Sequence, residues 1–286
     1  MASVTITPKD VSELRARTGA GMMDCKRALE ESGGDMEKAV ELLRKKGIAK
    51  AEKREGKSAS QGVVMIETSA DGREGAMVEL NCETDFVART EDFQALARAL
   101  ASHVAAHAEP GINAGNVEDQ AFTAGRTVAQ EMKQVSGKVG EVVALKRYAR
   151  FKPTDGVIGY YLHHNGMVGV LVELAGGTDA TALEAAKDVA LHISFADPID
   201  INPEDVPAEM IERERRIAEE QVAQEGKPEN IRGKIVDGKI RKFVAERTLV
   251  EQPFVRDDKT TVGQLLKKAG AGLTVTRFAR FKVGAA

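Results

Sequence analysis

Tryptophan is absent from this sequence of 286 residues, and aromatic residues make up only 4% of it. It has just two cysteines, Cys25 and Cys82, whose spacing suggests neither a disulfide framework nor a zinc site, as is typical of a reducing cytoplasm. No apolar run approaches the roughly 20 residues of a membrane-spanning helix, and the first residues show no secretory signal. We therefore expect a soluble, cytoplasmic chain in which an exposed aromatic ring needs an explanation.

Charge and chemistry exclude further classes of protein. The net charge of −3 is close to neutral and gives no general attraction to nucleic acid. Carboxylates are numerous, but none are paired in a motif that forms a cleft, so general acid–base catalysis has no visible carrier. The sequence favours a binding protein over an enzyme, and we expect neither a cofactor nor a metal.

Two basic features of the N-terminal third have ordinary explanations. Gly56-Lys57-Ser58 matches the end of a phosphate-binding loop, but the glycine that this motif requires five residues earlier is Ala51. A solvated linker is the better interpretation of this stretch. The basic residues at Lys26-Arg27 and Arg44-Lys45-Lys46 are typical of a solvated face or of a docking surface for an acidic protein.

Helical patterns fill the first 46 residues. Pro8 is placed to begin a helix that ends near Gly19, and a second helix is predicted from about Met22 to Glu31. Asp35 is a capping residue for a third helix, in which apolar residues recur at helical spacing. Three short helices joined by glycine turns indicate a small bundle of the ubiquitin-associated type.

The sequence also contains an internal duplication. Residues 62–88 align without a gap with residues 156–182, at an offset of 94, and ten of the 27 aligned positions are identical. In each copy two β-rich runs flank a turn dipeptide, Asp71-Gly72 or Asn165-Gly166, of the kind found in tight hairpins. The helices predicted after the two hairpins cover about 91–107 and 180–195.

The second copy carries an insertion. Ala149-Arg150-Phe151-Lys152 recurs at 279–282, where the offset has grown from 94 to 130, so 36 extra residues lie within the second copy. The charged stretch from Pro207 to about Arg247, broken at Gly226-Lys227-Pro228, has about this size, and its two halves carry opposite net charges. Opposite charges and regularly placed apolar residues favour an antiparallel coiled-coil hairpin. The apolar positions are Ile211, Ile217, Val222, Ile231, Ile235 and Ile240.

These patterns together predict an α+β fold. Each copy would form a three-stranded antiparallel sheet, made of the hairpin and a later strand and backed by helices. The predicted boundaries are 1–50 for the three-helix module, 51–61 for a linker, 62–152 for the first core unit, 153–205 for the first part of the second core unit, 206–246 for the arm, and 247–286 for the second part of that unit with a C-terminal module.

The segment after the first hairpin, Asn81 to Ala88, holds the candidate binding residues. Thr84 or Asp85 is placed to cap the helix that follows, which accounts for the Thr-Asp pair in both copies. Capping does not account for Phe86, because the second copy has Ala180 at that position. Phe86 either fills a core position or is an anchor offered to a partner, and both interpretations stay open at this point.

His163 and His164 come just before the second hairpin turn. Adjacent residues of a strand point to opposite faces, so we expect surface histidines rather than a shared metal site, with a partner contact as the alternative. Cys25 lies among apolar neighbours and is expected in the core. Neither cysteine has the cationic neighbours that mark a reactive thiol.

Two segments resemble the signature sequences of the elongation factor Ts family: Leu14-Arg15 with Thr18 to Lys26, and Asn81 to Ala88. Thr261 to Leu266, followed by Arg277 to Val283, resembles that family's C-terminal module, so the resemblance covers essentially the whole chain in order. It implies an exchange factor that binds the GTPase elongation factor Tu with GDP and speeds GDP release, so that GTP can replace it.

The resemblance also implies roles for individual residues. Asp85 and Phe86 would enter the partner, with the Phe86 ring wedged near the magnesium site of the nucleotide. The C-terminal module would touch the GTPase domain as well, and the arm would reach a partner surface of its own. The residues expected at the interface are Arg15, Met22, Met23, Thr84, Asp85, Phe86, Val87 and His164.

Two other functions stay open from the sequence. A scaffold or chaperone-like adaptor would use the helical module and the arm as docking surfaces, and a nucleotide hydrolase would depend on Gly56-Lys57-Ser58. Nucleotide exchange is the leading hypothesis. The sequence leaves open whether the arm mediates self-association or only binds a partner.

Overall fold

The computed structural model describes residues 5–52, 56–225 and 228–285. Helices make up 49% of it and strands 24%, in mixed helix and antiparallel sheet, which confirms the α+β class. The chain divides into two compact units. The first comprises residues 1–67, 77–149 and 282–286, and the second comprises residues 68–76 and 150–281.

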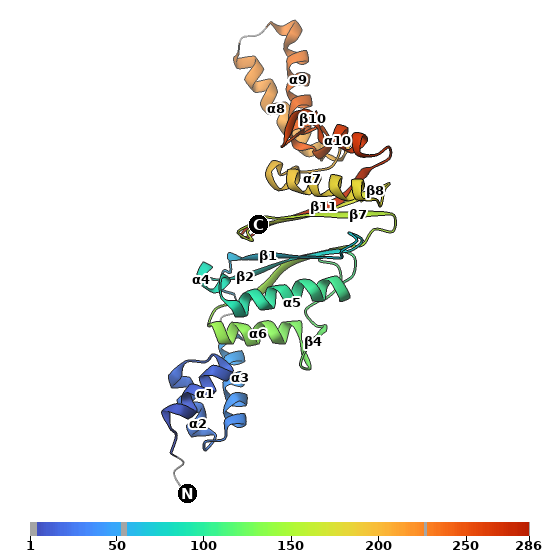
Figure 1. Ribbon diagram of the computed structural model, residues 1–286. Helices are drawn as coiled ribbons and strands as arrows, with labels where there is room; N and C mark the ends of the chain where they lie inside the picture. Colours follow the sequence, from blue (N-terminus) through green and yellow to red (C-terminus); the bar gives the residue numbers. More distant parts are fainter. Residues whose placement is uncertain (1–4, 53–55, 226–227, 286) are drawn as a thin grey trace. The chain divides into compact units, whose positions relative to one another are not determined.

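The first unit begins with three helices, α1 (Pro8–Thr18), α2 (Met22–Glu31) and α3 (Met36–Glu52), shown in blue in Figure 1. Thr7 and Asp10 form a capping box at the start of α1, and Gly19 ends this helix in the left-handed conformation. The Asp35 carboxylate accepts from the Lys38 N–H, so Asp35 caps α3 as predicted. The helices share one apolar core, whose buried members are Val11, Leu14, Cys25, Ala28, Leu29, Ala39 and Leu43.

A close helix contact joins these helices to the rest of the first unit. Helix α3 packs against α6 (Val128–Val139), and Gly47 of α3 meets Gly137 of α6 there. A Cβ atom on Gly137 would lie 2.7 Å from the backbone of Gly47, so a larger residue would push the two helices apart. Part of the predicted linker, residues 53–55, lies outside the described residues.

The first unit also contains a four-stranded sheet in the order β1-β2-β6-β3. These strands are β1 (Gln61–Thr68), β2 (Gly75–Cys82), β6 (Ala144–Phe151) and β3 (Gly111–Ile112). Every residue of β2 is buried, and α5 (Glu91–His107) lies along one face of the sheet in Figure 1. The prediction of three strands is wrong here. The segment after α5 follows the edge of β6, because Asn113 donates its N–H to the Tyr148 carbonyl and its side-chain oxygen accepts from the Tyr148 N–H.

The second unit contains a three-stranded sheet in the order β11-β8-β7, the number predicted. Strands β7 (Gly156–Leu162) and β8 (Val168–Ala175) are antiparallel, and β11 (Thr274–Lys282) comes from the end of the chain. Helix α7 (Ala180–Ala196) covers this sheet. A Cβ on Gly159 would lie 2.2 Å from the backbone of Ala186, so the glycine allows α7 to sit directly on β7.

Two further helices of the second unit, α8 (Ala208–Gln224) and α9 (Glu229–Arg247), pack side by side as a hairpin (Figure 1). Arg215 pairs with Asp237 across the two helices. Two of the predicted inward positions are wrong: Ile217 and Ile231 are exposed, and Ala218 and Val236 are buried instead. Of the predicted break between the arms, Gly226 and Lys227 lie outside the described residues. The buried residues between the helices are Ala218, Val222, Val236 and Ile240.

The structure extends the duplication well beyond the 27 positions aligned by sequence. Helices α5 and α7 have 17 residues each, and a histidine occupies the thirteenth position of both. His103 Nε2 donates to the side-chain oxygen of Gln120 at 2.9 Å, and His192 Nε2 donates to that of Gln252 at the same distance. Because the offset of the helices is 89 rather than 94, a search at a single offset misses this pair.

Gln120 and Gln252 are each followed by a short hairpin and then by a helix, so these elements also correspond in the two copies. The backbone carbonyl of each accepts from the first N–H of a following helix, α6 in one copy and α10 (Val262–Ala269) in the other, at 3.1 Å in both cases. Both of these helices begin with a Thr–Gln capping box. A short hairpin lies between each glutamine and its helix. The hairpins are β4 (Ala121–Thr123) with β5 (Arg126–Thr127), and β9 (Pro253–Phe254) with β10 (Asp257–Thr261). The 3-10 helices η1 (Pro203–Asp205) and η2 (Leu249–Glu251) flank the α8–α9 hairpin in sequence.

Candidate partner-binding site

The candidate site is built on a single helical turn, α4 (Asp85–Ala88), directly after β2. Val87 and Ala88 point inward and are buried, whereas Phe86 is 80% exposed, more than any other large apolar side chain in the described residues. Such exposure rules out the interpretation of Phe86 as a core residue. An exposed phenylalanine on a short, ordered turn is typical of an anchor for another molecule.

Thr84 ties this turn to the segment that follows α6. The backbone N–H of Thr84 donates to one oxygen of Glu141 at 2.9 Å, and the Thr84 hydroxyl donates to the other at 2.6 Å. The same hydroxyl accepts from the Val87 N–H at 3.4 Å and so caps α4. The backbone N–H and the hydroxyl of Thr84 therefore both hold α4 against the segment that follows α6.

A second carboxylate makes the reciprocal connection. Glu83 accepts from the backbone N–H of Val142 at 2.9 Å, and the Lys57 ammonium lies 3.4 Å from its other oxygen. Beside it, burial raises the pKa of the Cys82 thiol to about 12, and the charge of Glu141 adds to this effect. Cys82 is thus a protonated, unreactive thiol at neutral pH, as expected.

The Thr-Asp pair caps in a different way in each copy. Thr84 caps the one-turn helix α4, and α5 begins separately at Glu91, so neither Thr84 nor Asp85 caps the long helix as predicted. In the second copy Asp179 caps the long helix α7 directly, through its bond with the Ala182 N–H at 2.8 Å. Asp85 is exposed and pairs with Arg89.

The remaining candidates of the first unit lie on the N-terminal helices. Arg15 is exposed on α1, and Met22 and Met23 are 43% and 66% exposed at the start of α2. Cys25, also on α2, points into the core of the three helices as predicted. Two neighbouring exposed methionines form a flexible apolar surface that adapts readily to a partner.

His164 belongs to the second unit and is exposed. The expectation that His163 and His164 point to opposite faces is wrong, because β7 ends at Leu162 and the two rings lie 4.3 Å apart in the turn. His163 Nδ1 lies 3.0 Å from the Tyr161 hydroxyl. Among the described residues, no three or more histidine, cysteine, aspartate or glutamate side chains are grouped so that they could hold a metal ion.

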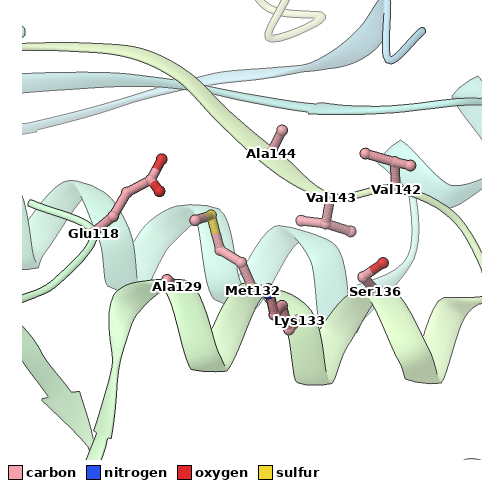
Figure 2. A pocket seen from close by; sticks show the side chains of 8 residues that line it. All are labelled: Glu118, Ala129, Met132, Lys133, Ser136, Val142, Val143 and Ala144. Carbon is pink, nitrogen blue, oxygen red and sulfur yellow. The ribbon is translucent and has the colours of Figure 1, made fainter. Parts of the chain in front are cut away.

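Two other features of the first unit carry no sign of nucleotide chemistry. Gly56-Lys57-Ser58 follows a helix and precedes β1, the reverse of the strand-to-helix order of a phosphate-binding loop. A hollow of about 170 Å³ lies between α6 and the start of β6 (Figure 2). Its lining is mainly apolar, and the Met132 side chain points from α6 toward the start of β6 (Figure 2). The lining residues are Glu118, Ala129, Met132, Lys133, Ser136, Val142, Val143 and Ala144.

Sequence reasoning missed Glu83 and Glu141. Glu83 lies within the segment Asn81 to Ala88 that carries the family resemblance, but nothing in that segment indicates what its carboxylate binds. Glu141 belongs to no recognised motif and lies 57 positions from the threonine that it binds. A further signal was the comparison of the copies, in which the glutamate next to the Thr-Asp pair is replaced by Gly177.

The fold and the site together define a binding protein in which an exposed ring, that of Phe86, projects from a turn held by Glu141. Residues 83–285 match the family model described as elongation factor Ts. Over 98% of its length the chain is 43% identical to elongation factor Ts of Aquifex aeolicus, covering 99% of that protein, and 46% identical to that of Methylococcus capsulatus, covering 93%. It is 42% identical to elongation factor Ts of Prosthecochloris aestuarii, covering 99% of it.

The chain therefore belongs to the elongation factor Ts family. This confirms the leading hypothesis: the chain is a nucleotide exchange factor for elongation factor Tu in translation elongation, and the scaffold alternative is not favoured. Among the helices of the described residues, none is long and apolar enough to cross a membrane.

Proposed function

We propose that Phe86 is the side chain with which this protein opens the nucleotide site of elongation factor Tu in its GDP form. The observation that carries the proposal is that Phe86 is 80% exposed on a turn that is fixed to the protein by hydrogen bonds from Thr84 to Glu141. The ring enters between helices of the partner near the magnesium site, and Asp85 accompanies it. No covalent step is needed.

The other contacts provide docking. Arg15, Met22 and Met23 bind the GTPase domain through a module of the ubiquitin-associated type, and their exposure supports this role. His164 makes a contact from the second unit. Val87 is buried, so we assign it the support of Phe86 rather than direct contact. The C-terminal module contributes to binding the GTPase domain.

The arm, α8 with α9, acts as a coiled coil that reaches a separate partner surface. Its two helices share the buried seam of Val222 and Ile240, which supports this proposal. The protein works in the cytoplasm and needs no direct contact with nucleic acid.

Exchange follows from coupling between two binding events. Insertion of the ring stabilises a conformation of the partner in which the contacts to magnesium and phosphate are weakened. Because linkage is reciprocal, the nucleotide weakens binding of this protein by the same factor, so the exchange factor leaves when nucleotide rebinds. It therefore speeds release and uptake alike, and the excess of GTP over GDP sets the direction.

Release of a fluorescent GDP from elongation factor Tu tests the proposal. We expect Phe86→Ala to lower the rate of stimulated release by at least about tenfold, as for a central interface anchor. Its melting temperature should stay unchanged, because the ring is exposed. Phe195→Ala is the matched control, since Phe195 is 63% exposed on α7 and should leave release unchanged. Undiminished release with Phe86→Ala would remove the ring from the mechanism.

A further inference from the structure

The segment after β2 and the segment after α6 are joined by a crossed pair of carboxylates. Glu141, just after the C-terminal Gly140 of α6, accepts from the N–H and the hydroxyl of Thr84. Glu83, next to Thr84, accepts from the N–H of Val142, next to Glu141. Each carboxylate thus holds the backbone beside the other, and Phe86 lies two residues beyond the bonded threonine.

The second copy shows what this turn looks like without the carboxylates. At an offset of 94, Gly177 replaces Glu83, and at the offset of 130 that relates the last strands, Ala271 replaces Glu141. Gly177 packs against Leu273, where a Cβ would lie 2.9 Å from that side chain. Between β8 and α7, all of whose residues are described, the second copy has no one-turn helix, and Ala180 stands in place of Phe86. Both acids and the exposed ring therefore occur together in one copy and are absent together from the other.

Capping alone does not require Glu141. The Thr84 hydroxyl caps α4 by accepting from the Val87 N–H, whereas Glu141 accepts from that hydroxyl and from the Thr84 N–H and so connects the turn to a segment 57 residues away. Charge-assisted hydrogen bonds of this kind are short and fix orientation. An aromatic side chain that must enter a partner loses less entropy on binding if its backbone is already held.

We propose that Glu141 is a positioning residue of the exchange reaction, which holds α4 so that the Phe86 ring projects in the orientation that enters the partner. This inference rests on the proposed role of Phe86. Glu141 acts through Thr84 and does not itself contact the partner's nucleotide site.

Kinetics of GDP release separate this role from simple docking. Glu141→Ala should lower the maximal stimulated rate by about tenfold, the scale of a lost hydrogen bond to a charged group. The concentration that gives half the maximal rate should change little, because the docking residues on α1 and α2 are intact. Glu141→Gln should be intermediate, since glutamine keeps one accepting oxygen. In the Phe86→Ala background, Glu141→Ala should cause no further loss, because its effect passes through the ring.

Asp179→Ala provides the matched control. It removes a carboxylate that binds a backbone N–H at the equivalent turn of the second copy, where no ring is exposed. If Glu141→Ala slows GDP release only because it destabilises the protein, Asp179→Ala should slow release equally when the two variants have the same melting temperature. That result would show that the proposal is wrong. Retained release with Glu141→Ala would overturn it as well.

A direct measurement of the ring distinguishes failure of this inference from failure of the wedge. Because the chain contains no tryptophan, Phe86→Trp introduces a single tryptophan, which can be excited selectively over the three tyrosines. In the free protein, adding Glu141→Ala should lower the anisotropy of this tryptophan, and adding Asp179→Ala should not. Unchanged anisotropy refutes positioning by Glu141, whatever Phe86 does to exchange. If the anisotropy falls but Phe86→Ala stimulates GDP release fully, Glu141 does position the turn, and the proposed role of the Phe86 ring in exchange is wrong.

Discussion

The two copies of the duplicated unit share an interior and differ at one turn. In each copy a buried histidine of the long helix binds a glutamine side chain, and a phenylalanine two residues after that glutamine packs near the histidine ring. The difference lies after the first hairpin, where one copy inserts α4 with the exposed Phe86 and the other continues directly into α7. The two copies therefore share a common interior and differ at the turn that carries the exposed Phe86.

The comparison of the two copies also shows what holds the turn that carries Phe86. An exposed apolar ring adds nothing to the core, so the turn that carries Phe86 is held by the buried Val87 and Ala88 and by hydrogen bonds from the neighbouring segment. In the first copy these hydrogen bonds come from Glu83 and Glu141, whereas in the second copy Gly177, the residue equivalent to Glu83, packs against Leu273. The turn of the first copy is therefore held by hydrogen bonds to carboxylates, and that of the second copy by apolar packing.

The largest expected effect tests whether the two interiors are equivalent. Gly62 and Gly156 lie at the start of the first strand of each hairpin, as the second residue of β1 and the first of β7. A Cβ would lie 2.1 Å from the Leu80 carbonyl oxygen at Gly62 and 2.0 Å from that of Leu174 at Gly156. We expect Gly62→Ala and Gly156→Ala each to lower the free energy of unfolding by about 3 kcal/mol, because strands must separate to fit the methyl group. Urea denaturation measures both. A tolerated substitution in one copy alone would show that the hairpins are packed differently.

A smaller effect concerns the buried histidines. Burial lowers the pKa of His192 below its ordinary value of 6.5, despite the bond to Gln252, and also lowers that of His103. The folded protein keeps these rings neutral, so the unfolded chain takes up protons first as the pH falls. The free energy of unfolding should be constant above about pH 7 and decrease below pH 6.5, by at most about 1.4 kcal/mol per pH unit for one histidine.

Substitution separates the two histidines. His192→Leu should remove more of this pH dependence than His103→Leu, because His192 is 1% exposed and His103 is 8% exposed. Thermal unfolding between pH 5 and 8 measures the slopes, which are informative even though either variant loses some stability. Equal slopes in the wild type and His192→Leu would contradict the assignment.

The smallest effect tests which residue caps in each copy. Asp179→Ala should lower the free energy of unfolding by about 1 kcal/mol, and Thr178→Ala should change it by less than about 0.5 kcal/mol. In the first copy the order reverses: Thr84→Ala should cost more than Asp85→Ala, since Asp85 makes only an exposed pair with Arg89. The same order in both copies would show that the Thr-Asp pair has one role throughout.

Much of the architecture followed from local rules. Glycine turns and capping residues located the N-terminal helices, because these signals depend on backbone conformation within a few residues. The hairpins and their long helices followed from the repeat and from Asp-Gly and Asn-Gly turns. The comparison of the two copies also singled out Phe86, because only the first copy has a ring at that position.

Other features depend on contacts between distant segments and had no local signal. The inward face of the arm differs from the predicted one, because Ile217 and Ile231 look like core residues until the partner helix is placed. The fourth strand β3 requires the edge of β6, and the proximity of the histidine rings requires that β7 end at Leu162. The arm and the fourth strand are thus set by segments distant in the chain, whereas the histidine pair is set by where the β7–β8 hairpin turn begins.

By itself, the sequence determined that the chain is duplicated, that it is built of capped helices and hairpins, and that one turn carries a ring its counterpart lacks. Only the tertiary structure decided that this ring is exposed, that Thr84 rather than Asp85 caps its turn, and that Glu141 holds it. The reason is physical: capping and turn formation involve neighbouring backbone groups, whereas exposure and bracing depend on which distant segments the fold brings together.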